Sequence, residues 1–205
     1  MRDERLIVFA DYVSPFCCLA DHVLRRFRRG RGVRVDGAAV ELYPTGTPLP
    51  EPGASERIAE WRDALPLARG LGVELRRPVL ATRTRKAHEA AAYARSAGRF
   101  DDMHTAIFAA LWQEGSDIGR IDVLVEIGSG IGLDVTALRV ALDIDQWTER
   151  VEQDEAWAVH LGLPGVPAHV RAAAAADGTT VAADVRIGFQ QLDELAAWWE
   201  RNDDL

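Results

Sequence analysis

The residues best able to do chemistry in this chain are Ser14 and Cys17, in the stretch DYVSPFCCLADH at positions 11–22. They flank a Pro-Phe dipeptide at the three-residue spacing of a dithiol motif, and that spacing brings two side chains to one side of a helix. The first position is a hydroxyl, which has no redox couple, so no disulfide can form between the two positions. Any redox turnover must therefore use Cys17 as a single thiol, or a thiol that a ligand supplies.

Both residues also have a purely structural interpretation. Ser14 is a good N-cap residue, with Pro15 at the first helical position. Cys17 can be a small buried hydrophobic residue, as most free cysteines are. The adjacent Cys18 points away from it by about 100° on a helix and is expected in the core. Because the chain has only these two neighbouring cysteines, we expect no disulfide framework.

The elements around this motif predict a β-α-β opening. Residues 5–10, RLIVFA, are typical of a short buried strand. The helix that starts at Ser14 is expected to end near Gly30 and Gly32. A second strand is expected over 38–44, parallel to the first through a right-handed crossover.

Helices are expected after a proline- and glycine-rich loop at 45–52. Pro66 predicts a kink or break in the first of them, and Asp134 is expected to cap another. The expected helices cover 54–72, 84–99, 100–115, 117–133, 134–143 and 145–162. The GSGIG stretch at 128–132 is interpreted as a helix end, because no strand precedes it as a phosphate loop would require.

The end of the chain returns to strands. The pair Asp177-Gly178 predicts a hairpin turn, and 188–202 is expected to form a closing helix. The order β-α-β, helical block, β-β-α is the layout of the thioredoxin fold, of the α/β class. We expect one domain over 1–205, with a core from about 1–45 and 160–205 and a large all-helical insertion at about 50–160.

In this layout chemistry occurs at the start of the first helix. Free backbone N–H groups and the positive end of the helix dipole stabilise an anion there, such as a thiolate of the chain or of a ligand. A second feature, GLPGVPAHV at 162–170, precedes the first strand of the predicted hairpin. It favours a cis peptide bond at Pro167, a rare geometry with a positional purpose. An ordinary trans proline in a loop is the alternative.

Composition narrows the class of protein. The chain is 48% hydrophobic and 27% charged, as globular proteins are. Its net charge of −8 argues against nucleic-acid binding. No apolar run has the ~20 residues of a membrane span, and no signal peptide is present, so a cytoplasmic location is the default expectation. The five histidines lack the i,i+4 pairing of a zinc helix, so no metal site is expected.

The chain resembles the cytoplasmic DsbA-like thioredoxin proteins of the FrnE type. It is also similar to their relatives, the kappa-class glutathione transferases and the 2-hydroxychromene-2-carboxylate isomerases. The resemblance rests on DYVSPFCCLA, on ALWQEGSDIGRIDVL followed by GLD, and on GLPGVPAHV. It covers nearly the whole chain.

The two branches differ at the motif. FrnE-type proteins carry C-P-x-C, and the kappa and isomerase branch carries S-P-x-S, whose first serine holds the glutathione sulfur as a thiolate. This chain has SPFC, so Ser14 matches the glutathione branch and Cys17 the redox branch. The resemblance implies that Ser14 and Cys17 are the catalytic pair. It also implies four residues that bind the thiol substrate: Pro15, Phe16, Val166 and Pro167.

The resemblance implies a FrnE-like oxidoreductase whose thiol chemistry is monothiol or glutathione-dependent. Two alternatives stay open: a glutathione-dependent isomerase or transferase, and a non-catalytic module that binds a peptide or small ligand. Glutathione is the candidate cofactor, and no metal is expected. The expected partners are a small thiol or a protein thiol or disulfide, and a second copy in a homodimer. The candidates to hold the glutathione carboxylates are Arg76, Arg77, Arg83, Arg85 and Lys86.

Overall fold

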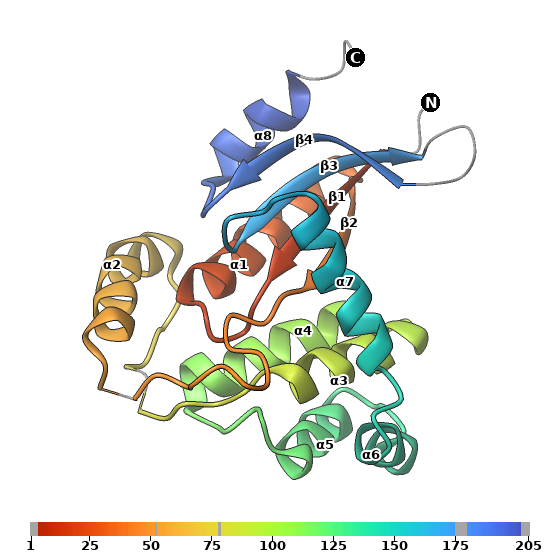
Figure 1. The fold of residues 1–205 in the computed structure, drawn as a ribbon. Helices are drawn as coiled ribbons and strands as arrows, with labels where there is room; N and C mark the ends of the chain where they lie inside the picture. The colour runs from red at the N-terminus through yellow and green to blue at the C-terminus, as the bar shows by residue number, and fades with distance from the viewer. Residues whose placement is uncertain (1–3, 52, 78, 175–179, 202–205) are drawn as a thin grey trace.

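The computed structural model describes residues 4–51, 53–77, 79–174 and 180–201. Its centre is a four-stranded sheet in the order β2-β1-β3-β4, with helices on both faces (Figure 1). The strands are β1 (Arg5–Ala10), β2 (Arg34–Ala39), β3 (Ala168–Ala174) and β4 (Thr180–Ile187). Strand β1 is parallel to β2 and antiparallel to β3, which is antiparallel to β4. This is the predicted thioredoxin-like arrangement.

The alternation of β1 side chains decides what covers each face of the sheet. Leu6 and Val8 pack with apolar residues of α1 (Pro15–Arg31) and α8 (Leu192–Glu200). Ile7 and Phe9 pack on the other face with residues of α7 (Thr148–His160) and β3. Both sets are buried, which explains why β1 is apolar from Leu6 to Ala10.

The strand over 5–10 and the helix after it are confirmed. Helix α1 has Ser14 at the N-cap position and Pro15 in its first turn, and it ends at Gly32. Gly32 has a φ of 65°, the left-handed conformation in which glycine commonly terminates a helix. The β1–α1 junction thus places the SPFC motif at the end of the sheet where β1 terminates.

The prediction of the second strand over 38–44 is wrong. Strand β2 is Arg34–Ala39, and the chain after it forms a loop. The strand lies at the edge of the sheet, where charged residues are tolerated because they face partners or water. Asp36 forms ion pairs there with Arg5 and Arg34. The charged residues of 34–39 made this segment unlike a buried strand in the sequence, yet the ion pair between Asp36 and Arg5 stabilises its position beside β1.

The chain between β2 and β3 is helical, as predicted. Pro66 lies inside the continuous helix α2 and does not break it. Asp134 caps α6 through its carboxylate, which accepts from the Thr136 and Ala137 amides, so that prediction is confirmed. The remaining elements are α2 (Ser55–Leu71), α3 (Arg85–Ser96), α4 (Phe100–Ala109), a π-helical turn η1 (Ala110–Glu114), α5 (Ile121–Gly130) and α6 (Val135–Asp143).

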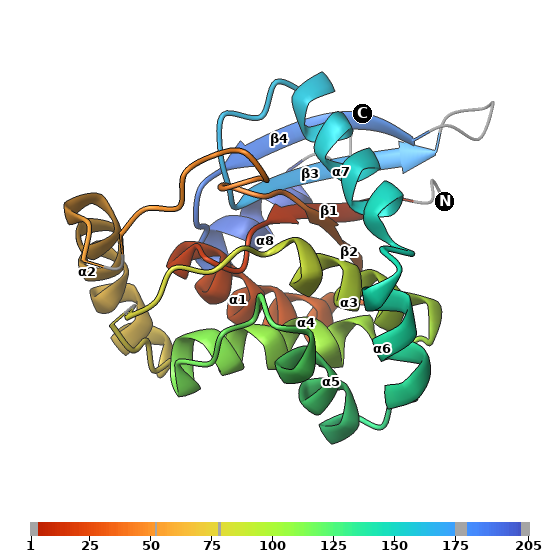
Figure 2. The same ribbon diagram turned by 60° about the horizontal axis from the view of Figure 1, so that its bottom comes forward.

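Helix α2 lies apart from the other inserted helices. In the views of Figures 1 and 2 it lies at one side of the molecule near the start of α1, whereas α3, α4, α5 and α6 gather under the sheet. Helix α2 contacts α1, so the inserted segment reaches the end of the fold that carries the SPFC motif. Among the residues described, no helix combines the length and apolar character that crossing a membrane requires.

Strands β3 and β4 form the predicted antiparallel pair, with Ala168 opposite Ile187. The predicted turn at Asp177-Gly178 lies outside the described residues. The alanines at the end of β3 have a helical preference, yet Ala172 is fully buried between β1 and β4. Burial and strand pairing outweigh the intrinsic preference here.

Candidate functional site

Ser14 occupies the predicted N-cap position, but its hydroxyl makes no capping hydrogen bond. The side chain is 1% exposed, and Oγ donates instead to Oε1 of Glu60 in α2, at 3.3 Å. The amide of Cys18 bonds to the Ser14 carbonyl and begins the helix. The first N–H groups of α1 have no intrahelical acceptor, so Ser14 combines a hydroxyl with an anion-stabilising helix end.

Cys17 is buried, with a residue exposure of 1%. Burial raises the pKa of its thiol well above the ordinary range, and hydrogen bonding to the Asp11 backbone and the Ser14 side chain offsets only part of that rise. The thiol is therefore protonated at neutral pH, and a thiol rather than a thiolate is a poor nucleophile. The Ser14 side chain is near enough to affect the pKa of the Cys17 thiol, but Cys17 lacks the exposure and charge state of a reactive cysteine.

Cys18 is also in the core, as predicted, with 6% exposure. Burial raises the pKa of its thiol to about 12, and the nearby Asp21 carboxylate reinforces that rise. Both cysteines are free thiols. Neither has the electropositive, accessible surroundings that reactive cysteines need.

Two carboxylates border Ser14. Asp11 is fully buried, and its carboxylate accepts from the amides of Val13 at 3.4 Å and Leu42 at 2.6 Å, which fixes the turn that leads into α1. Glu60 is half-buried, and burial raises the pKa of its carboxyl above the ordinary value, while the Ser14 hydrogen bond lowers it in part. A carboxylate that accepts from a serine hydroxyl and has a raised pKa is a candidate proton acceptor for that hydroxyl.

The loop before β3 lies beside the motif through strand register. Phe9 pairs with Ala168, so Val166 and Pro167 lie level with the chain that leaves β1. The Val166–Pro167 peptide bond is cis. Pro167 is buried, and Val166 and Phe16 both pack against the core cluster that contains Cys17. Pro15, Phe16, Val166 and Pro167 thus gather at the same end of the sheet as Ser14.

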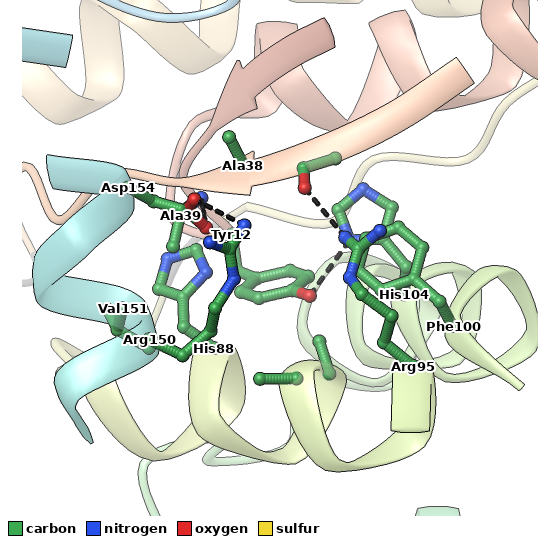
Figure 3. A pocket seen from close by; sticks show the side chains of 13 residues that line it. Tyr12, Ala38, Ala39, His88, Arg95, Phe100, His104, Arg150, Val151 and Asp154 are labelled. Atoms are coloured by element: carbon green, nitrogen blue, oxygen red, sulfur yellow. Dashed lines mark hydrogen bonds and ion pairs between the residues drawn. The ribbon is translucent and has the colours of Figure 1, made fainter. Parts of the chain in front are cut away.

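A separate small cavity lies between β2 and the helices α3, α4 and α7 (Figure 3). The hydroxyl of Tyr12 and Nδ1 of His104 face each other across it at 2.8 Å. Its volume of about 20 Å³ is room for about one water molecule. The cavity is too small for a substrate, and its residues act on stability instead.

The basic residues proposed for the glutathione carboxylates are not gathered at Ser14. Arg83 donates to the backbone carbonyls of Tyr43, Pro44 and Thr47. Arg85 pairs with Glu41 and Glu155, and Lys86 pairs with Glu89 and Asp145. All three cations therefore already have acidic or carbonyl partners. Arg83 and Arg85 connect the helical block to the loop after β2, and Lys86 connects α3 to the segment after α6. Arg76 and Arg77 are exposed.

Nothing in the local sequence singles out Glu60. It is separated from Ser14 by 46 residues, and only the packing of α2 against α1 brings the two together. Arg57, one turn earlier in α2, was missed for the same reason. Among the described residues, no cluster of three His, Cys, Asp or Glu side chains is arranged to hold a metal ion.

Residues 5–196 match the family model of the DSBA-like thioredoxin domain. The chain therefore belongs to the DSBA-like thioredoxin domain family, and it has a thioredoxin-like fold. Among curated proteins, it is 30% identical over 140 residues to the uncharacterized protein YwbO of Bacillus subtilis (strain 168), a match that spans 66% of this chain and 70% of YwbO.

Solved structures agree on the fold. The cytosolic disulfide reductase DsbM from Pseudomonas aeruginosa, solved with GSH, is 19% identical, with a TM-score of 0.71, over 98% of this chain and 100% of DsbM. A 2-hydroxychromene-2-carboxylate isomerase is 17% identical, with a TM-score of 0.74, over 96% of this chain and 94% of the isomerase. The family and its structural neighbours include oxidoreductases and isomerases.

Proposed function

We propose that this protein is a FrnE-type thiol enzyme of the DsbA family whose reactive sulfur comes from a bound thiol of the glutathione class. The observation that carries the proposal is the contrast at the motif. Both residues are buried, but Cys17 is a thiol with a raised pKa, whereas Ser14 has a hydroxyl that donates to Glu60 at a helix start beside a cis-proline loop. Such a site favours an anionic sulfur supplied by a ligand.

In this proposal the ligand thiol binds against Ser14 and the first turn of α1. The thiol proton passes to Ser14 Oγ while the serine proton passes to Glu60, which already accepts from that hydroxyl. The sulfur becomes a thiolate held by the hydroxyl and the helix amides. It then attacks a disulfide sulfur of the substrate, forming a mixed disulfide and releasing the other sulfur as a thiolate. A second molecule of the ligand thiol resolves the mixed disulfide.

The second candidate function is a glutathione-dependent isomerase. The residue at the first motif position favours it, because Ser14 matches the S-P-x-S pattern of that branch. The isomerase in the comparison has the same fold. The two functions differ in the fate of the ligand: an isomerase returns its thiol unchanged, whereas a disulfide reductase converts it to the disulfide. Measuring oxidised glutathione during turnover separates them.

Ser14→Ala is expected to weaken glutathione binding by about tenfold or more, because a charge-assisted hydrogen bond to the sulfur contributes about 1.5–3 kcal/mol. Cys17→Ala is expected to leave binding unchanged, because the buried thiol does not meet the ligand sulfur. Calorimetric titration of the two variants and the wild type measures this. Ser129→Ala, at an exposed position of α5, is the matched control. No binding by the wild type at millimolar glutathione would overturn the proposed function, as would insulin reduction that depends on Cys17 and not on glutathione.

Glu60→Gln tests the proton acceptor. With Glu60 present, the proton of the bound thiol stays in the site, so binding at neutral pH is expected to release little acid to the buffer. Without the carboxylate the proton must leave, so the variant is expected to release about one proton more for each thiol bound as thiolate. Calorimetry in two buffers with different heats of ionisation counts these protons. Glu56→Gln, on an exposed turn of the same helix, is the control, and equal proton release by all three proteins would contradict the role of Glu60.

A further inference from the structure

Arg57 in α2 is a buried cation without a partner. The residue is 6% exposed, and its Nη1 atom is buried with no hydrogen-bond acceptor among the residues described. No ion pair within 4.0 Å is formed by its guanidinium in that part of the chain. A guanidinium carries five N–H donors and is always charged. Burying such a group costs desolvation free energy unless acceptors satisfy its hydrogen bonds and its charge.

The position of Arg57 connects it to the site. It precedes Glu60 by one helical turn, and Glu60 accepts from Ser14. Burial raises the pKa of Glu60 and of Tyr43, and the positive charge of Arg57 lowers both in part, so the guanidinium lies within electrostatic range of both groups. The ordinary acceptors of an arginine are nearby, yet none of them pairs with it.

Arg57 also lines a small, mainly apolar cavity. Trp112 lines it together with Arg57 and also donates through Nε1 to the Tyr12 carbonyl at 2.9 Å, next to the SPFC motif. The cavity volume is about 10 Å³, which is less than a carboxylate needs. Val79, which is 70% exposed, and the exposed Arg77 form part of its wall, so these surface side chains can move aside for a ligand.

We propose that Arg57 binds a carboxylate of the thiol ligand whose sulfur meets Ser14. This inference rests on the proposed function and adds a specificity determinant to it: the ligand is an anionic thiol, and its carboxylate completes the hydrogen bonding of a buried guanidinium. An Arg–carboxylate pair is frequently bidentate, which orients the ligand as well as holding it. Arg83, Arg85 and Lys86 already have acceptors, whereas Arg57 does not.

The test compares Arg57→Met with the wild type in binding two probes: reduced glutathione and its diethyl ester, which keeps the thiol but has no free carboxylate. The wild type is expected to bind glutathione at least about tenfold more tightly than the ester, and Arg57→Met is expected to bind the two alike. Arg62→Met, at an exposed position of the same helix, is expected to behave as the wild type. Arg57→Lys is expected to keep part of the preference, because it retains the charge without the planar fork.

Thermal unfolding without ligand separates binding from a structural role. Removal of an unpaired buried charge is expected to leave the melting temperature of Arg57→Met equal to or above that of the wild type. If the variant melts well below the wild type, Arg57 has a structural role and the inference is overturned. It is also overturned if Arg57→Met still prefers glutathione to the ester as the wild type does; the proposed function then stands. If the wild type binds neither probe, the proposed function itself has failed, and this inference fails with it.

Discussion

Ser14→Cys is expected to give a disulfide reductase that reduces insulin about 100-fold faster than the wild type, or more, in the presence of dithiothreitol. The substitution places a thiol at a helix start, where the N–H groups and the dipole favour the thiolate. Positions 14 and 17 are close together, because the Ser14 side chain lowers the pKa of the Cys17 thiol in part. The wild type cannot run this dithiol cycle, because its hydroxyl cannot enter a disulfide.

Burial of Cys17 suits a resolving role in that variant. The introduced thiol attacks a substrate disulfide and forms a mixed disulfide, and Cys17 then displaces the substrate, so that two electrons pass from the dithiol to the substrate. The Glu60 carboxylate beside position 14 disfavours a thiolate there. Ser14→Cys combined with Glu60→Gln is therefore expected to be faster still near neutral pH.

The double variant Ser14→Cys, Cys17→Ala is the control for Ser14→Cys. It is expected to accumulate mixed disulfides and to turn over slowly, because no resolving thiol is left. Thiol titration of oxidised Ser14→Cys is expected to find only Cys18 free. If Ser14→Cys reduces insulin no faster than the wild type, the placement of positions 14 and 17 as an active pair is wrong.

His104 is expected to make the fold sensitive to acid. It lies in α4 between Tyr12 and Phe100, with its Nδ1 at 2.8 Å from the Tyr12 hydroxyl (Figure 3). Burial lowers its pKa to about 3, and electrostatic interactions with His88 and Arg95 reinforce that shift. The folded protein therefore keeps this imidazole neutral at pH values where an unfolded chain protonates it.

The direction of the change in stability with pH follows from which state, folded or unfolded, binds the proton more readily. Above pH 6.5, the ordinary value for histidine, neither state is protonated and the contribution is fully present. As the pH falls from 6.5 toward 3, the unfolded state takes up a proton that the folded state refuses, so stability is lost. Between pH 7 and pH 4 the loss is about 3 kcal/mol for this one group.

A variant isolates that contribution from those of other groups. Burial raises the pKa of Asp21 to about 6 and that of Glu41 to about 7, and these shifts add stability as the pH falls. The quantity to measure is therefore the difference in the free energy of unfolding between the wild type and His104→Asn. The variant is expected to gain about 3 kcal/mol on the wild type from pH 7 to pH 4.

Denaturant unfolding at the two pH values gives this difference. His160→Asn, at the exposed end of α7, serves as the control and is expected to change the pH dependence far less. A wild-type advantage over His104→Asn that is equal at pH 7 and pH 4 would contradict the assignment. It would mean that the His104 imidazole is protonated as easily in the folded protein as in the unfolded chain.

The sequence was sufficient to predict those elements whose structure depends on interactions between residues close together in the chain. The apolar run at 5–10 predicts a buried strand, and Ser14-Pro15 predicts the start of a helix that ends at a glycine. The N-cap role of Asp134 could be predicted from the sequence, because an N-cap contact spans only two or three residues. The second strand was misplaced because Asp36 and Arg34 belong to an edge strand, and the ion pair of Asp36 with Arg5 of the neighbouring strand is not visible in the sequence.

The sequence by itself determined that positions 14 and 17 cannot store two electrons, because a hydroxyl has no redox couple, and that the motif stands at a helix start. Only the tertiary structure decided what surrounds that start. Packing of α2 against α1 brings Glu60 to the serine hydroxyl, and it leaves Arg57 buried with no acceptor for its Nη1 among the described residues. Burial also leaves Cys17 a neutral thiol. Solvent exclusion and contacts between distant segments set these properties, and neither is encoded in the spacing of residues along the chain.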